Sequence, residues 1–113
     1  MSRNESAVRL RHMLDHAREA IALTADKTRS DLDQDRTLNL ALVRLLEIVG
    51  EAASRTPKEE RQNHPDIDWP QIVGLRNRLI HGYDFVDFDL LWQIVNDDLP
   101  PLIIRLEEIL NPK

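Results

Sequence analysis

The sequence predicts an all-α fold, organised as a bundle of four to five helices. Apolar residues recur at helical spacing through most of the chain. There are only three glycines, and aromatic residues make up 4%, which disfavours a β-sandwich or barrel. Hydrophobic residues make up 42% and charged residues 31%, a balance typical of globular proteins. A length of 113 residues fits a single domain spanning 1–113.

The first half of the chain predicts two long helices. One runs from about 7 to 25, with Ser6 as a plausible N-cap, and the polar stretch 26–35 follows as a loop. The second runs from about 35 to 55 and ends before the next proline. Its apolar stripe is the widest in the chain, which predicts burial against more than one neighbour. A short polar helix is expected near 58–63.

The second half predicts two further helices. Asp68 is followed by tryptophan and proline, the pattern of an N-cap with proline in the first turn, and Gly82 is a natural terminator for this helix. Asp87 can cap the last helix, 88–110. The two prolines at 100–101 predict a kink or break in that last helix.

Composition excludes several classes of protein. Without cysteine, the chain has no disulfide, no thiolate chemistry and no cysteine-based metal site. No apolar run resembles a signal peptide or a membrane span, so we expect a cytoplasmic protein without a membrane partner. The net charge, 15 − 20 = −5, argues against a protein that coats nucleic acid. It leaves room for an enzyme that binds nucleic acid through one local basic site.

Two pairs at helical spacing are weaker candidates for a site. His12 and His16 lie four residues apart, as metal ligands often do, but no third ligand is identifiable, so we expect no metal. Glu47 and Glu51 are also four apart, and we expect them to form ion pairs with Arg44 or Arg55. Trp69 and Trp92 are expected to anchor the core or a dimer interface.

The segment that carries chemistry contains Arg76, Asn77, Arg78, His81 and Tyr83. Asn77 and His81 are four residues apart, so on a helix they share a face and the amide can orient the imidazole. Arg76 and His81 are five apart, about 140° around a regular helix. Either the helix ends before His81, or a second subunit brings another such segment close.

These groups suit RNA cleavage without a metal. A neutral imidazole can accept the proton of a 2′-hydroxyl, and an imidazolium can protonate the leaving oxygen. Arg76 can hold a phosphate and stabilise the charge of the transition state, with Arg78 steering phosphate nearby. The structural alternative is that His81 only caps the helix C-terminus and that Tyr83 packs its ring on the bundle.

The segment resembles a known family signature. Arg76, four residues, His81, one residue and Tyr83 resemble the R-x4-H-x-Y motif of HepT proteins, a branch of the HEPN superfamily. Asn77 fits the polar position after the arginine. The stretches 35–52, 64–69 and 98–101 resemble the family's long second helix, its loop before the motif and its final helix, respectively.

The resemblance implies a HEPN-type bundle that forms a two-fold homodimer with a composite cleft. It implies a metal-independent endoribonuclease toxin, with Arg76 and His81 catalytic, Asn77 and Arg78 supporting, and no cofactor. The implied partner is a minimal nucleotidyltransferase antitoxin that transfers AMP from ATP to Tyr83. Added phosphate there would fill the anion site and repel RNA. The alternative is a non-catalytic helical module, or the regulatory subunit of a nucleotidyltransferase.

Overall fold

The structure, a computed structural model, describes residues 3–81 and 85–112, and the chain is all-α there apart from one very short hairpin. In chain order the elements are α1 (Arg3–Thr24), α2 (Asp31–Gln34), α3 (Arg36–Arg55), α4 (Lys58–Asn63), α5 (Trp69–Val73), α6 (Leu75–Leu79), β1 (Ile80–His81), β2 (Phe85–Val86), α7 (Phe88–Gln93), the π-helix η1 (Ile94–Asp98) and α8 (Leu99–Leu110). The predicted fold class is therefore confirmed. None of the described helices combines the length and apolar character needed to cross a bilayer.

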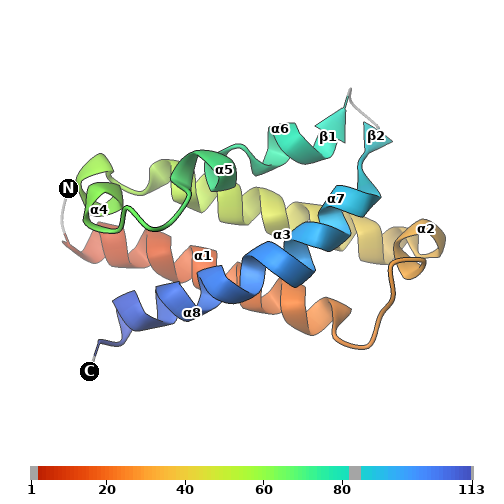
Figure 1. Cartoon of the computed structure of the whole chain (residues 1–113), viewed down its shortest axis with the longest axis horizontal. Coiled ribbons are helices and arrows are strands. Elements are labelled where there is room, and N and C mark those ends of the chain that lie inside the picture. Colours follow the sequence, from red (N-terminus) through yellow and green to blue (C-terminus); the bar gives the residue numbers. More distant parts are fainter. Residues whose placement is uncertain (1–2, 82–84, 113) are drawn as a thin grey trace.

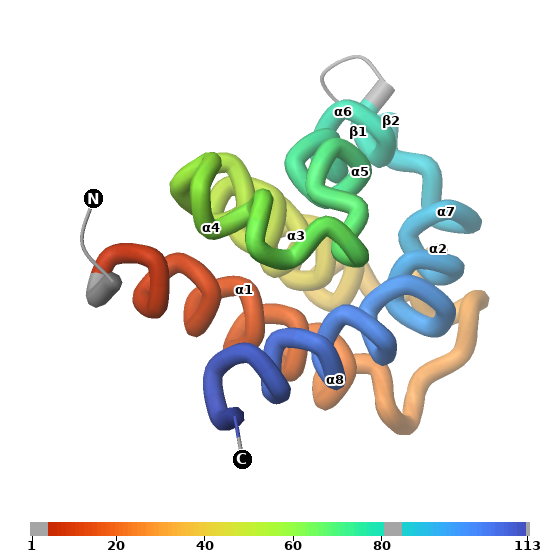
Figure 2. The backbone as a smooth tube through the Cα atoms, turned by 60° about the vertical axis from the view of Figure 1, so that its left-hand side comes forward, coloured from red at the N-terminus to blue at the C-terminus, as the bar shows by residue number. Residues whose placement is uncertain are grey.

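The long helices form the body of the bundle (Figure 1). α1 and α3 run in opposite directions and pack along each other, and α8 crosses α1. α5 and α6 lie along another side of α3 and lead into the β1–β2 hairpin at one end of the molecule (Figure 2). α3 thus contacts helices on several sides, as the width of its apolar stripe predicts.

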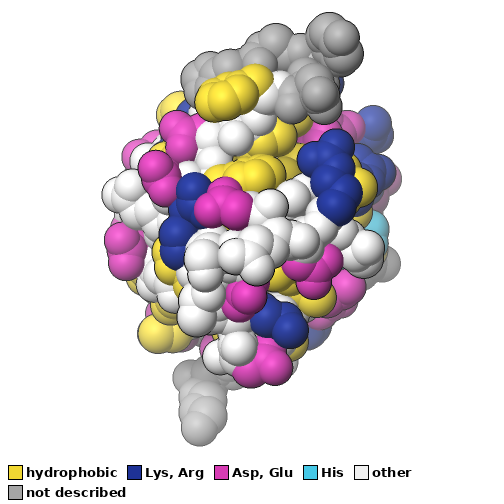
Figure 3. Space-filling view, turned by 90° about the vertical axis from the view of Figure 1, so that its right-hand side faces the viewer, with side chains coloured by type: hydrophobic (Ala, Val, Ile, Leu, Met, Phe, Trp, Pro, Cys, Tyr) yellow, Lys and Arg dark blue, Asp and Glu magenta, His cyan; other side chains and the backbone are white. Residues whose placement is uncertain are grey.

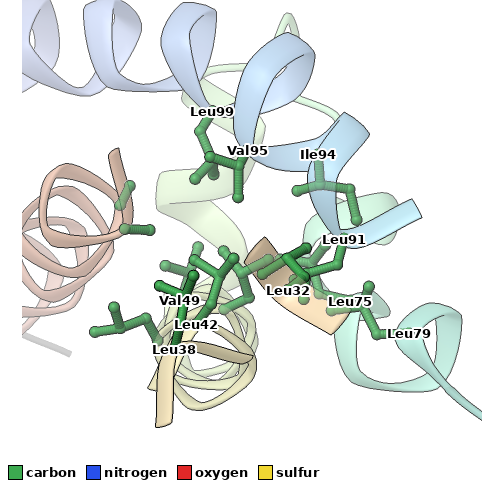
Figure 4. Packing of buried hydrophobic residues seen from close by; sticks show 14 residues of the cluster. Leu32, Leu38, Leu42, Val49, Leu75, Leu79, Leu91, Ile94, Val95 and Leu99 are labelled. Atoms are coloured by element: carbon green, nitrogen blue, oxygen red, sulfur yellow. The ribbon is translucent and has the colours of Figure 1, made fainter. Parts of the chain in front are cut away.

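Two apolar clusters fill the interior. Figure 4 shows the larger, in which leucine, isoleucine and valine side chains from α2, α3, α6, α7 and η1 converge. The smaller cluster joins the first half of α1 to the end of α3, with Trp69 buried and its Nε1–H donated to the His64 carbonyl at 3.0 Å. Trp69 is therefore a core residue, as one of its two predicted roles required. A fully buried leucine such as Leu42 contributes about 2 kcal/mol from burial.

Three of the described helices begin directly after an aspartate whose side chain caps the first turn. Asp35 accepts a hydrogen bond from the Leu38 N–H at 3.0 Å, and α3 runs from the next residue to Arg55, as predicted. Asp68 and Asp87 cap α5 and α7 in the same way. Ser6 is not a cap, however: α1 begins at Arg3, so this side chain lies within the helix, where it is buried.

The predicted loop 26–35 contains a short helix, α2. Asp31 accepts a hydrogen bond from the Thr28 N–H at 2.7 Å, which closes the turn before it. Leu32 is fully buried, and its carbonyl accepts from the Asn39 side chain at 2.9 Å. The buried Leu32 side chain and the hydrogen bond from Asn39 therefore stabilise a short helix in a segment whose polar composition predicts a loop.

The single helix predicted from Asp68 to Gly82 is wrong in two respects. It is interrupted at Gly74, which separates α5 from α6, and α6 ends at Leu79. Beyond that point Ile80 is extended and pairs with Val86 in the antiparallel hairpin. The Asp87 N–H donates to the Leu79 carbonyl at 2.9 Å, so the returning strand takes a carbonyl that a longer helix would have used.

Of the kink or break predicted at the two prolines, the break is absent. The last helix continues from α7 through η1 into α8, and the irregularity is the π-helical segment just before the prolines. The Leu99 N–H donates to the Ile94 carbonyl, five residues back. Pro100 and Pro101 then occupy the first turn of α8, where a missing N–H is tolerated.

Candidate active site

Arg76 projects from α6 toward α3. Its Nε donates to Glu47 Oε2 at 3.2 Å, which joins two helices across 29 residues of sequence. The Arg76 side chain is 68% exposed, whereas that of Glu47 is 24% exposed. Only Nε is engaged within the described part of the chain, so the Nη donors remain available to an anion from solvent. The ion pair therefore fixes the base of the guanidinium while its outer edge faces outward.

Gly50 allows α5 and α6 to lie this close to α3. A Cβ at this position would lie 3.0 Å from the Ile72 carbonyl oxygen, closer than nine in ten real Cβ contacts. The absent side chain therefore sets the separation between the two helical layers. That separation is what lets Glu47, one turn before Gly50 on α3, reach Arg76.

A polar hollow of about 480 Å³ opens beside the Arg76–Glu47 pair. α3 contributes Arg44, Glu47, Gly50, Glu51 and Ser54 to its lining. The other side is formed by Val73, Arg76 and Asn77. The structure thus brings together two of the predicted site residues, Arg76 and Asn77, around one surface depression.

Arg78 lies elsewhere. Two residues after Arg76 on a short helix, it points to the opposite side, where its Nη2 lies 3.9 Å from Asp98 Oδ2. It lines a second hollow, of about 440 Å³, between α5 and the η1–α8 segment. There Arg105 donates to Asp66 at 2.6 Å, and this hydrogen bond lowers the pKa of the Asp66 carboxyl. Arg78 therefore does not share the hollow that Arg76 and Asn77 line.

His81 ends β1, where its backbone pairs with Phe85. Because the helix stops at Leu79, the first of the two arrangements expected for Arg76 and His81 is the one observed. The same ending removes the helical spacing on which the predicted contact between Asn77 and His81 depended. The side chain of His81 and the whole of residues 82–84, including the predicted modification site Tyr83, lie outside what the structure describes.

The two glutamates of α3 have different partners. Glu51 pairs with Arg55 at 2.8 Å, as predicted. Glu47 pairs with Arg76 and not with either predicted arginine, so it belongs to the candidate site. Sequence reasoning missed this role because the partner is remote in the chain and no local pattern indicates it.

The histidines of α1 form a local contact. His16 Nδ1 lies 2.7 Å from the His12 carbonyl oxygen, within hydrogen-bonding distance. In the part of the chain that the structure describes, no three histidine or acidic side chains are grouped as a metal site.

Positive and negative side chains are mixed on the face of the molecule near α2 and β2 (Figure 3). Figure 3 views the end of the molecule near α2 and β2, and basic and acidic side chains are interspersed there, with hydrophobic side chains reaching the surface between them. Neither sign of charge dominates this face. The described side chains of this face therefore offer no broad basic surface to a polyanion (Figure 3).

Comparison with known proteins supplies the family. Residues 13–109 match the family described as ribonuclease HepT-like. A protein of Methanocaldococcus jannaschii, named as a candidate RNase, is 35% identical over 107 residues, covering 95% of this chain and 98% of the relative. Another so named, from Caldanaerobacter subterraneus, is 36% identical over 102 residues, covering 90% and 91%. A candidate ribonuclease HepT of Thermococcus cleftensis is 36% identical over 100 residues, covering 85% and 91%.

No solved structure matches the chain significantly. The family match spans most of the chain, from within α1 to the end of α8, and includes the whole Arg76–Tyr83 segment. The chain therefore belongs to the ribonuclease HepT-like family.

Proposed function

We propose that this chain is a metal-independent endoribonuclease toxin of the cytoplasm, with Arg76 and His81 as its catalytic residues. The observation that carries the proposal is the end of α6 at Leu79, before His81. A continuous helix would turn these two side chains about 140° apart, whereas the extended backbone of β1 removes that constraint. The exposed guanidinium of Arg76, held at Nε by Glu47, supports its role as a phosphate ligand.

The chemistry uses the substrate's own hydroxyl. Neutral His81 accepts the proton of the 2′-hydroxyl, whose oxygen attacks the adjacent phosphorus. The bond to the 5′-oxygen breaks, and an imidazolium returns a proton to that leaving oxygen. Arg76 stabilises the added charge on the phosphoryl oxygens. The products are a 2′,3′-cyclic phosphate and a 5′-hydroxyl. In a two-fold homodimer, a second copy of His81 can supply the acid.

The test is cleavage of a defined oligoribonucleotide in excess chelator, with the ends analysed by mass spectrometry. We expect cleavage to persist, with 2′,3′-cyclic or 3′-phosphate ends. His81→Ala should remove most activity, whereas Arg11→Ala, at an exposed arginine on α1, should not. Activity that disappears with chelator and returns with magnesium would overturn the mechanism. Full activity in both His81→Ala and Arg76→Ala would exclude these residues as the catalytic pair, whereas no cleavage by the wild-type chain would favour the non-catalytic alternative.

We further place the chain in a toxin–antitoxin pair with a minimal nucleotidyltransferase. The phenol oxygen of Tyr83 attacks the α-phosphorus of ATP, pyrophosphate leaves, and the tyrosine carries AMP. The new phosphodiester brings a permanent negative charge two residues from His81. It would compete with RNA for Arg76. We therefore expect the chain to be inactive while Tyr83 carries AMP and active as a toxin when Tyr83 is unmodified.

The proposed homodimer can be tested independently. Light scattering should give twice the chain mass at micromolar concentration, because the composite cleft needs two copies of the motif segment. A monomer with full RNase activity would exclude a composite site. A mixed dimer of Arg76→Ala and His81→Ala protomers should retain activity if each cleft takes its two residues from different chains.

A further inference from the structure

The hollow beside Arg76 contains a second arginine, Arg44. This side chain is exposed on α3, and no ion pair to it is found among residues 3–81 and 85–112. The residues three and four positions before Arg44 and four positions after it are apolar: Ala41, Leu40 and Ile48. Arg44 is thus an exposed cation that pairs with no carboxylate in the described part of the chain.

The nearby acids are already engaged. Glu47, three residues after Arg44, bonds to Arg76 at 3.2 Å, and Glu51 bonds to Arg55 at 2.8 Å. The lining of the hollow carries two arginines and two glutamates, a formal charge of 2 − 2 = 0, and Arg55, outside the lining, offsets the charge of Glu51. Because Arg76 and Arg55 already pair with these glutamates, Arg44 can attract one phosphate on a chain of net charge −5 without a general affinity for polyanions.

The rest of the lining suits the other parts of a nucleotide. Asn77 offers an amide that can donate and accept hydrogen bonds to a base edge. Val73 is 37% exposed and presents apolar surface on which a base can lie. Ser54 donates its hydroxyl to the Glu51 carbonyl at 2.7 Å, so its oxygen can accept from a ribose hydroxyl. The volume, about 480 Å³, lies within the usual range of small-molecule sites.

From this geometry we infer that the hollow is an RNA subsite for the nucleotide next to the scissile bond, with Arg44 binding the adjoining phosphate. The inference rests on the proposed function, since it takes Arg76 as the ligand of the scissile phosphate. Arg76 and Arg44 line the same depression from α6 and α3, so one strand of RNA can reach both. All residues named for this subsite belong to one chain.

The test measures RNA binding apart from cleavage. In a His81→Ala background, fluorescence anisotropy with a labelled single-stranded oligoribonucleotide gives the dissociation constant at several salt concentrations. Arg44→Gln should raise it by about three- to tenfold and lower the slope of log affinity against log salt by about 0.7, the loss of one phosphate contact. Arg11→Gln removes an exposed arginine on α1, away from the hollow, and should leave binding unchanged.

Substrate length supplies the second measurement. In the otherwise wild-type chain, Arg44→Gln should reduce kcat/KM on an oligoribonucleotide more than on a dinucleotide, which has no adjoining phosphate to bind. Equal affinity of Arg44→Gln and Arg11→Gln for RNA would overturn the subsite, even if the chain cleaves RNA. RNA binding that depends on Arg44 in a chain that cleaves nothing would uphold the hollow as an RNA-binding site and refute the proposed activity.

Discussion

Replacing Arg76 by alanine separates a catalytic role from a structural one. The Arg76–Glu47 pair is 3.2 Å long, and the arginine side chain is 68% exposed. Exposed ion pairs contribute about 0–1 kcal/mol, because water screens the attraction and both side chains lose freedom. Arg76→Ala should therefore reduce the free energy of unfolding by less than about 1 kcal/mol, a fall in Tm of about 4 °C or less.

The expected effect on cleavage is much larger. Loss of a donor aimed at transition-state charge typically lowers kcat by about 10²–10³-fold. Arg76→Lys keeps the charge but loses the planar pair of donors, so its activity should lie between those of wild type and Arg76→Ala. The measurements are thermal unfolding by circular dichroism and initial rates on a fluorogenic oligoribonucleotide.

Arg18→Ala is the matched control. Arg18 joins α1 to α8 by an ion pair with Glu107, and its side chain is 44% exposed. Its loss should affect stability about as much as the loss of Arg76 and leave cleavage unchanged. If Arg76→Ala instead destabilises the fold by more than about 2 kcal/mol, or keeps cleavage within about tenfold of wild type, Arg76 is a structural residue and the assignment fails.

Three further changes test other parts of the molecule. Tyr83→Phe should keep RNase activity but take up no AMP-sized mass from the nucleotidyltransferase and ATP, and an adduct that persists on this variant would place the modification elsewhere. Gly50→Ala should lower Tm by about 4 °C, because the close contact of a Cβ 3.0 Å from the Ile72 carbonyl oxygen costs more than the gain of about 1 kcal/mol in helix propensity. A rise in Tm would show that α5 can move away from α3 without loss of stability. Arg105→Gln should lower Tm at neutral pH but not in strong acid. The hydrogen bond from Arg105 lowers the pKa of Asp66 in the folded chain, so it stabilises the fold at pH values above the pKa that Asp66 has in the unfolded chain. This contribution disappears as the pH falls through the pKa of Asp66 in the folded chain. A deficit in Tm that persists in acid would mean that Arg105 acts through packing.

The elements that sequence could predict are those specified within a few residues. α3 begins after Asp35 and α7 after Asp87 because each aspartate caps its own helix. The end of α6 depends instead on pairing between β1 and β2, and on the Asp87 N–H that reaches Leu79. The helical periodicity of Leu75–Ile80 does not indicate that contact, so the helix predicted from the sequence is too long.

The candidate site was predictable in its chemistry and less so in its geometry. The residue types of the motif segment, with the family resemblance, indicated Arg76 and His81. The contact of Glu47 with Arg76 was not predictable, since 29 residues separate them and Glu47 has candidate arginine partners on its own helix. The close approach at Gly50 was equally hidden, because glycine within a helix reads from sequence only as a weak helix former.

The division of charge around α6 explains how an acidic chain can still present a site for RNA. Arg76 and Arg78 leave this short helix on opposite sides and enter hollows of different character. On the Arg76 side, each of the two glutamates is held by an arginine. On the Arg78 side, Asp97 and Asp98 lie among other carboxylates that outnumber the arginines of that hollow. We therefore expect a polyanion to be repelled from the Arg78 side of α6 and to bind, as proposed, on the Arg76 side, because the local distribution of charge matters more at this range than the net charge of −5.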